Sequence, residues 1–241
     1  MTTETVPRTL GLIAGLGVGA GIFYYRSLVN AHSKRGLSPH IMMVHADVRQ
    51  VTALAQARET QHLAQYLVGL LQKMADAGAD VATIPAFSPQ VCAKELEKLT
   101  PLPLIGLLDA IVDEAQRRKL RRVAIFGARV TMETELFGRL RDVAEVVSLS
   151  PIETEQVGEI YGRIVEAEGA SPEEYAMLRS LAHQMVEREG VDAIVLAGTD
   201  LSLVFRPEDT DFPHLDGART HIQAIMGVMA PQIRASWPGQ P

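Results

Sequence analysis

The sequence predicts an α/β protein built from two similar halves. Short apolar runs of strand length alternate with amphipathic stretches along the chain of 241 residues. Such runs are typical of parallel strands that are covered by helices on both faces. Residues 78–86 also resemble residues 190–198, because each segment has a Gly-x-Asp turn, an apolar run and then a small residue. The same offset of 112 residues carries Gly15 onto Gly127, which indicates a repeated α/β unit.

The alternation of apolar and amphipathic stretches gives the expected order of elements. We expect strands over residues 10–14, 41–46, 81–85, 104–107, 123–126, 143–149 and 193–197. We expect helices over residues 22–34, 59–77, 109–119, 133–141, 153–168, 172–189 and 220 to about 233. If the two halves face each other, the carboxyl ends of their strands meet at one cleft, where open α/β sheets bind ligands.

Composition excludes several classes of protein. The mean hydropathy is near zero, and the apolar runs are far shorter than the roughly 20 residues that span a bilayer. The net charge is −6, and the one basic cluster, at 117–122, ends an expected helix, so we expect no nucleic-acid partner. The single cysteine, Cys92, excludes an intramolecular disulfide, and the first eight residues hold no apolar signal segment. We therefore expect a cytoplasmic protein with a packed Cys92. A homodimer is compatible with the chain, and the oligomeric state stays open.

A glycine-rich loop follows the first expected strand. Gly15-x-Gly17-x-x-Ala20 fits a dinucleotide-binding fingerprint, in which backbone N–H groups at a helix N-terminus hold a pyrophosphate. Asp47 follows the next strand, where an acidic residue would bind the ribose. Against a nucleotide cofactor, the second half has its own glycine landmark, Gly127, and no segment is left for a separate substrate domain. Without H-x-x-x-H or C-x-x-C spacing we expect no metal.

Three further segments place hydroxyl groups after expected strands. Ser88 precedes Pro89 and suits a helix N-cap, a position that can equally hold a substrate carboxylate. Thr199 and Asp200 follow the last strand of the second half and can cap a helix or face the cleft. Thr131 is the expected N-cap of the helix at 133–141.

Six blocks of the chain resemble the aspartate/glutamate racemase family in order and spacing. These blocks are GLIAGLGVGAGIFYYRSL, VHADVRQVTAL, VAIFGARVTMETELF, VVSLSPIETEQVGEIYGRI, GVDAIVLAGTDL and HLDGARTHIQAI. The resemblance implies two pseudo-symmetric α/β halves and no cofactor. It implies a first half at 1–108, completed by 209–241, and a second half at 109–208. It also implies one cysteine from each half on either side of the substrate α-carbon.

The chain departs from the family at both cysteine positions. Ala86 and Gly198 stand there, and Phe87, Pro89 and Gln90 replace further residues of the family's first motif. Neither a methyl group nor a hydrogen atom can exchange a proton with a substrate, so the two-thiol mechanism is excluded in this chain.

Other residues are then candidates for the chemistry. The catalytic candidates are His45, Asp47, Glu133, Asp200 and His221. The residues expected to contact substrate are Gly17, Arg49, Phe87, Ser88, Thr131, Thr199 and Asp200. Arg49 is the favoured carboxylate anchor because its planar guanidinium can bind a carboxylate through two hydrogen bonds. A surface ion pair of Arg49, a capping role for His221 and a helix-dipole role for Glu133 are the structural alternatives.

Three functions stay open at the level of sequence. The first is an isomerase- or lyase-type enzyme that binds a small carboxylate or amino-acid-like substrate. The second is a non-catalytic protein that binds a small carboxylate. The third is that Ala86 and Gly198 were introduced to trap a substrate, which does not explain Phe87, Pro89 and Gln90.

Overall fold

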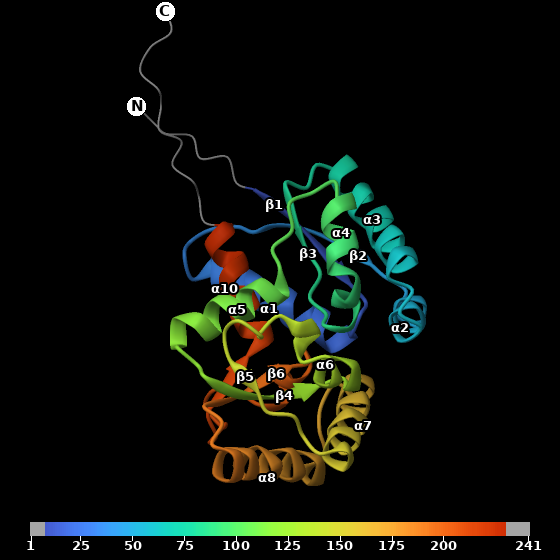
Figure 1. Cartoon of the computed structure of the whole chain (residues 1–241). Helices are drawn as coiled ribbons and strands as arrows, with labels where there is room; N and C mark the ends of the chain where they lie inside the picture. Colours follow the sequence, from blue (N-terminus) through green and yellow to red (C-terminus); the bar gives the residue numbers. More distant parts are fainter. Residues whose placement is uncertain (1–7, 230–241) are drawn as a thin grey trace, which may run out of the picture.

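The computed structural model describes residues 8–229, which form two parallel sheets with helices packed around them (Figure 1). The strands are β1 (Thr9–Ala14), β2 (His40–His45), β3 (Val81–Thr83), β4 (Arg122–Gly127), β5 (Glu145–Val146), β6 (Ala193–Ala197) and β7 (His214–Asp216). The α-helices are α1 (Val18–Ser33), α2 (Val48–Gln56), α3 (Thr60–Asp76), α4 (Ala93–Leu99), α5 (Leu107–Arg118), α6 (Arg129–Glu133), α7 (Pro151–Ala167), α8 (Pro172–Glu189), α9 (Leu201–Val204) and α10 (Gly217–Val228). Two short 3₁₀ helices are η1 (Ser88–Cys92) and η2 (Leu136–Gly138).

The two sheets repeat one arrangement. In the first sheet β1 lies between β2 and β3, and in the second β4 lies between β5 and β6, with every pairing parallel. A bridge from Ala82 to Leu104 continues the first sheet beyond β3, in the place that β7 takes beside β6. The expected α/β fold with two similar halves is therefore confirmed.

Alternating side chains of β1 bury the two faces of the first sheet. Leu10 and Leu12 pack against Tyr24 of α1 and against α10. Ile13 packs on the opposite side, in the cluster that α3 contributes to. This period of two is what a strand with helices on both faces requires.

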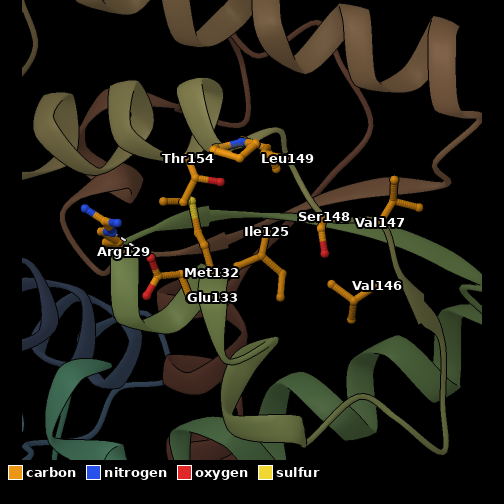
Figure 2. A pocket seen from close by; sticks show the side chains of 10 residues that line it. Ile125, Arg129, Met132, Glu133, Val146, Val147, Ser148, Leu149 and Thr154 are labelled. Atoms are coloured by element: carbon orange, nitrogen blue, oxygen red, sulfur yellow. Dashed lines mark hydrogen bonds and ion pairs between the residues drawn. The ribbon is translucent and has the colours of Figure 1, made fainter.

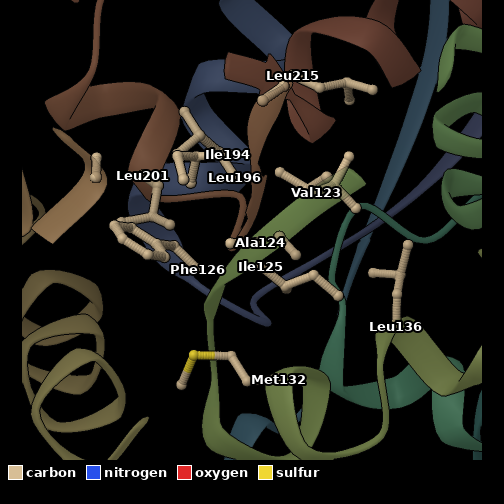
Figure 3. Close-up of a cluster of buried hydrophobic side chains, with 14 of the residues drawn as sticks. Val123, Ala124, Ile125, Phe126, Met132, Leu136, Ile194, Leu196, Leu201 and Leu215 are labelled. Carbon is tan, nitrogen blue, oxygen red and sulfur yellow. The ribbon is translucent and has the colours of Figure 1, made fainter. Parts of the chain in front are cut away.

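The second half has the larger core. Its centre is the pair β4 and β6, whose side chains include Phe126 and Leu196, both without exposed surface (Figure 3). Helices α7 and α8 begin with complete capping boxes, at Ser150 and Ser171, each followed by proline in the first turn. Such boxes satisfy free N–H groups at a helix start and fix where it begins.

The last helix returns the chain to the first half. Ile222 and Ile225 of α10 pack with Leu10 and Leu12 of β1, and α10 also lies along α5 (Figure 1). The preceding strand, β7, hydrogen-bonds to β6 in the second sheet. No observation fixes domain boundaries, so 1–108 with 209–241, and 109–208, stay predictions.

Several expected elements differ from the structure. The expected helix at 133–141 is wrong: α6 ends at Glu133, because Glu135, Leu136 and Phe137 all have positive φ angles, which an α-helix does not allow. The expected strand at 143–149 shortens to Glu145–Val146, and 104–107 makes only the single bridge. Helices α2 and α4 and strand β7 were not expected. Residues 230–233 of the last expected helix, and residues 1–7 of the segment judged to lack a signal, lie outside the described residues.

Candidate functional site

A cleft of about 830 Å³ opens between the two halves. The first half contributes the loop after β1, helix α2 and Ser88, and the second half contributes the start of α6 and one side of α7. The cleft thus lies at the carboxyl ends of strands from both sheets, where a parallel α/β protein binds its ligand.

The start of α1 is capped by a residue of the other half. The backbone N–H of Ala20 donates a hydrogen bond to Asp200 Oδ1 over 3.2 Å. A Cβ atom on Gly17 would lie 3.0 Å from Asp200 Oδ2, and Gly17 has a φ of +147° that favours glycine. The carboxylate of Asp200 therefore occupies the helix N-terminus where the fingerprint would place a pyrophosphate. Burial raises the pKa of Asp200 to about 6, although its hydrogen bonds act in the opposite direction.

The two positions without thiols differ in their surroundings. Ala86 is buried, and its carbonyl oxygen accepts a hydrogen bond of 2.9 Å from Gln90 Nε2. Gly198 lies under the ring of Tyr161, which comes from α7. A Cβ atom on Gly198 would stand 2.7 Å from Tyr161 Cζ and still closer to Cε2, well inside van der Waals contact. Any side chain at position 198 would thus collide with this ring.

Tyr161 is a cleft residue that the sequence analysis did not single out. It is half-buried and lines the cleft. Burial, and then the carboxylate of Asp200, raise the pKa of Tyr161 well above its ordinary value. The phenol is therefore protonated at neutral pH. No local sequence signal distinguishes it from the other residues of an amphipathic helix.

Three of the candidates lie at the end of β2 or just after it, and their surroundings differ. The ring of His45 lies against Gly15, where a Cβ atom would lie 2.7 Å from His45 Cε1. Gly15 lines the cleft, whereas His45 itself is not among the lining residues. Asp47 caps α2, accepting hydrogen bonds from the N–H groups of Arg49 and Gln50 at 2.9 and 3.3 Å. Arg49 is exposed and is not among the residues that line the cleft.

The expected substrate contacts are only partly brought together. Gly17 and Ser88 line the cleft, whereas Thr199 and Asp200 are buried behind its surface. Ser88 starts η1 and makes no capping hydrogen bond, so the expected N-cap role is wrong. Phe87 was expected to add apolar bulk to the pocket, but its side chain packs in the core of the second half.

Thr131 lies inside α6 rather than before it. The N-cap of α6 is Ala128, so the capping role expected for Thr131 is wrong. Its side chain has no exposed surface, and its hydroxyl has no hydrogen-bond partner within residues 8–229. It does not line the cleft.

His221 is the centre of a buried network in the first half. Its Nε2 lies 3.0 Å from the Ile105 carbonyl oxygen and 2.9 Å from Thr83 Oγ1, and its Nδ1 lies 3.0 Å from the Tyr24 hydroxyl. A carbonyl only accepts, so Nε2 carries the proton and Tyr24 donates to Nδ1. Burial lowers the pKa of His221 to about 4, so the ring is neutral. With no exposed surface, it joins α1, β3 and α10 rather than facing the cleft.

A smaller cavity of about 270 Å³ (Figure 2) shares the lining residues Arg129 and Glu133 with the cleft. Their side chains form an ion pair of 2.6 Å, and both line the two cavities. The smaller cavity also exposes Ser148 and Thr154 (Figure 2). Glu133, a catalytic candidate, therefore reaches the cleft as the partner of an arginine.

Arg58 is a second cleft residue that the sequence did not reveal. It follows α2 with a φ of 56°, and the N–H groups of Arg58 and Glu59 donate to the carbonyl oxygens of Ala55 and Leu54. This Schellman pattern usually has glycine at the position of Arg58. Its side chain lines the cleft.

Neither a metal-binding cluster nor a membrane-spanning helix is present in residues 8–229. Within residues 8–229 no three His, Cys, Asp or Glu side chains are grouped as a metal ion would require. No helix in the same range has the length and apolar character needed to cross a membrane.

A family model for Asp/Glu/Hydantoin racemase matches residues 13–225. This chain belongs to that family. The structural relatives of this racemase-family chain include a Yersinia pestis protein named as a candidate Asp/Glu racemase, at 24% identity and a TM-score of 0.80, covering 92% of this chain and 99% of that one. An aspartate racemase homologue from Pyrococcus horikoshii OT3 has 18% identity and a TM-score of 0.78, with the same coverage.

A glutamate racemase from Francisella tularensis, solved in complex with D-glutamate, is more distant. It has 12% identity and a TM-score of 0.61, covering 92% of this chain and 81% of that one. At these identities the likeness shows a shared fold.

Proposed function

We propose that this racemase-family protein binds a small carboxylate or amino-acid-like substrate in the cleft and acts on it by isomerase- or lyase-type proton chemistry without thiols or a cofactor. The observation that carries the proposal is Tyr161, a residue of the cleft lining whose ring fills the space that Gly198 leaves. The Francisella relative in complex with D-glutamate supports a carboxylate as the ligand.

The proposed chemistry follows from the different acid–base roles that we assign to Tyr161 and His45. Tyr161 is held protonated, so it can give a proton to a carbanion but is poorly suited to remove one. We assign the base to His45 of the other half, whose exposed imidazole lies against Gly15 of the cleft lining. Racemisation requires each of two groups to serve as acid and as base in turn. An unequal pair instead favours reactions that protonate one face of the substrate.

The nucleotide-cofactor alternative has less support. The N–H of Ala20, which a pyrophosphate would use, already donates to Asp200. A dinucleotide would have to displace a buried carboxylate of the same charge sign. The alternative that positions 86 and 198 were altered to trap a substrate also has less support, because the Tyr161 ring is fitted to a glycine.

The experiment is hydrogen exchange at Cα in heavy water, followed by proton NMR, with a panel of carboxylates and amino acids. We expect exchange or turnover with at least one of them, a large loss in Tyr161→Phe, and no loss in Tyr25→Phe, whose exposed ring lies outside the cleft lining. Racemisation of aspartate or glutamate should stay at the level of buffer.

A non-catalytic binding protein is the second candidate. It would bind a carboxylate, detected as a rise in Tm, but would show no exchange or turnover in either the parent or the variant. Proton chemistry that survives in Tyr161→Phe would contradict the role of Tyr161.

A further inference from the structure

The cleft lining is mainly apolar where the two halves face each other. The aliphatic side chains on the lining are Leu16, Val18, Val48, Ala55, Ala128, Val130 and Val165. Val18 and Val48 begin α1 and α2, and they are 52% and 42% exposed. Resting on the proposed function, we infer that the ligand is a monocarboxylate with an apolar body, of the size of a phenyl or branched alkyl group, rather than a dicarboxylate such as aspartate or glutamate.

The charges on the lining support one carboxylate and not two. The lining arginines are Arg58 and Arg129, and they stand with three glutamates, Glu133, Glu166 and Glu168. Arg129 is already paired with Glu133 at 2.6 Å. Arg58 makes no ion pair with any residue in the range 8–229. A second carboxylate on the ligand would therefore face glutamates without a free cation, which is unfavourable.

The volume of the cleft and the exposed valines also favour a ligand with an apolar body. A cleft of about 830 Å³ lies in the upper part of the range for sites that enclose drug-sized ligands, roughly 300 to 1,000 Å³. Val18 and Val48 are half-exposed on the lining, and an apolar ligand surface that covers them lowers the free energy of the complex. An apolar ligand body supplies that surface, and the chain of a dicarboxylic amino acid ends instead in a second charge.

The test compares two probes by calorimetric titration, 3-phenylpropanoate and glutarate. We expect the parent protein to bind 3-phenylpropanoate at least about tenfold more tightly than glutarate. Arg58→Gln should weaken both probes, because each presents a carboxylate. Val18→Thr with Val48→Thr keeps the side-chain shape and should weaken 3-phenylpropanoate roughly tenfold, since each change removes an apolar contact of about one methyl group.

The control is Ile152→Thr, which also changes a β-branched apolar side chain to threonine. Ile152 is 74% exposed and is not among the residues that line the cleft. It should leave both affinities unchanged, and circular dichroism should show that every variant is folded. Tighter binding of glutarate, or a silent double valine variant, would overturn the ligand class while leaving the proposed function intact. Failure of the parent to bind either probe would overturn both.

Discussion

The ring of Tyr161 leaves no room for a side chain at position 198. Gly198→Ala should lower the free energy of unfolding by about 1 to 3 kcal/mol, because an added methyl group in a packed site forces its neighbours apart. Urea unfolding of this variant, of Tyr161→Ala and of the double variant measures the effect. In the double variant the methyl group has space, so its cost should largely disappear. Additive costs would show that the ring does not cause the strain.

Arg58 has a left-handed backbone conformation that favours glycine. A change to glycine at this position should therefore affect stability and binding in opposite directions. Arg58→Gly should raise the free energy of unfolding by about 0.5 to 1 kcal/mol by relieving the left-handed conformation, yet weaken carboxylate binding. Lys119→Gly is the matched control, since Lys119 ends α5 with a φ of 55° and lies outside the cleft lining. It should stabilise similarly and leave binding unchanged. Equal binding by both variants would remove Arg58 from the site.

At the scale of elements, two buried groups that join separate elements respond to acid in opposite directions. The pKa of His221 falls from 6.5 to about 4 on folding, so its contribution to stability is full above pH 6.5 and is lost as the pH falls toward 4. The pKa of Asp200 rises from 3.8 to about 6, so its contribution is full below pH 3.8 and is lost as the pH rises through 6. Between pH 6.5 and 4.5 the two effects oppose each other.

Asp200→Asn should therefore make the protein more sensitive to acid. Asparagine still caps a helix, but it removes the group whose protonation offsets that of His221. The free energy of unfolding should fall between pH 6.5 and 4.5 by about 2 kcal/mol more than in the parent, on the usual scale of about 1.4 kcal/mol for each pKa unit. Urea titrations across this range measure the difference, with the exposed Asp142→Asn as control. If the free energy of unfolding varied with pH in parallel for the parent and Asp200→Asn, the raised pKa of Asp200 would be contradicted.

Element by element, the sequence was informative where the local signals are strong. The apolar run of β6 and the Ser-Pro start of α8 predicted both elements closely. Helix 133–141 could not be excluded from sequence, because residues 135–137 have positive φ angles but include no glycine or proline that would signal them. The site was harder, since Tyr161 reaches Gly198 only through the fold. Val157, Ile160 and Ile164 mark the core face of α7, and nothing in that spacing selects the tyrosine.

Across the whole molecule, the single thiol reports on global unfolding. Cys92 has no exposed surface, and its Sγ donates to the Pro89 carbonyl oxygen at 3.1 Å. Burial, and then Glu95, raise its pKa to about 12, so we expect negligible alkylation at pH 7.5 while the protein is folded. Pulsed alkylation along a urea series should give the same midpoint as circular dichroism, and ligand binding should survive the reagent. Rapid labelling of the folded protein, with loss of binding, would show that Cys92 takes part in ligand binding or catalysis.

The return of α10 to β1 also determines how the molecule would respond to tension. Leu10 and Leu12 near the start of the described chain share one buried cluster with Ile222 and Ile225 near its end. A force that pulls Thr9 away from Val228 is therefore carried first by the contact between β1 and α10. The sheet β5-β4-β6-β7 lies between these points in the sequence, so the chain through it is stretched only after that contact separates. The second half is thus mechanically shielded by the first, and under tension the first half is expected to yield before it.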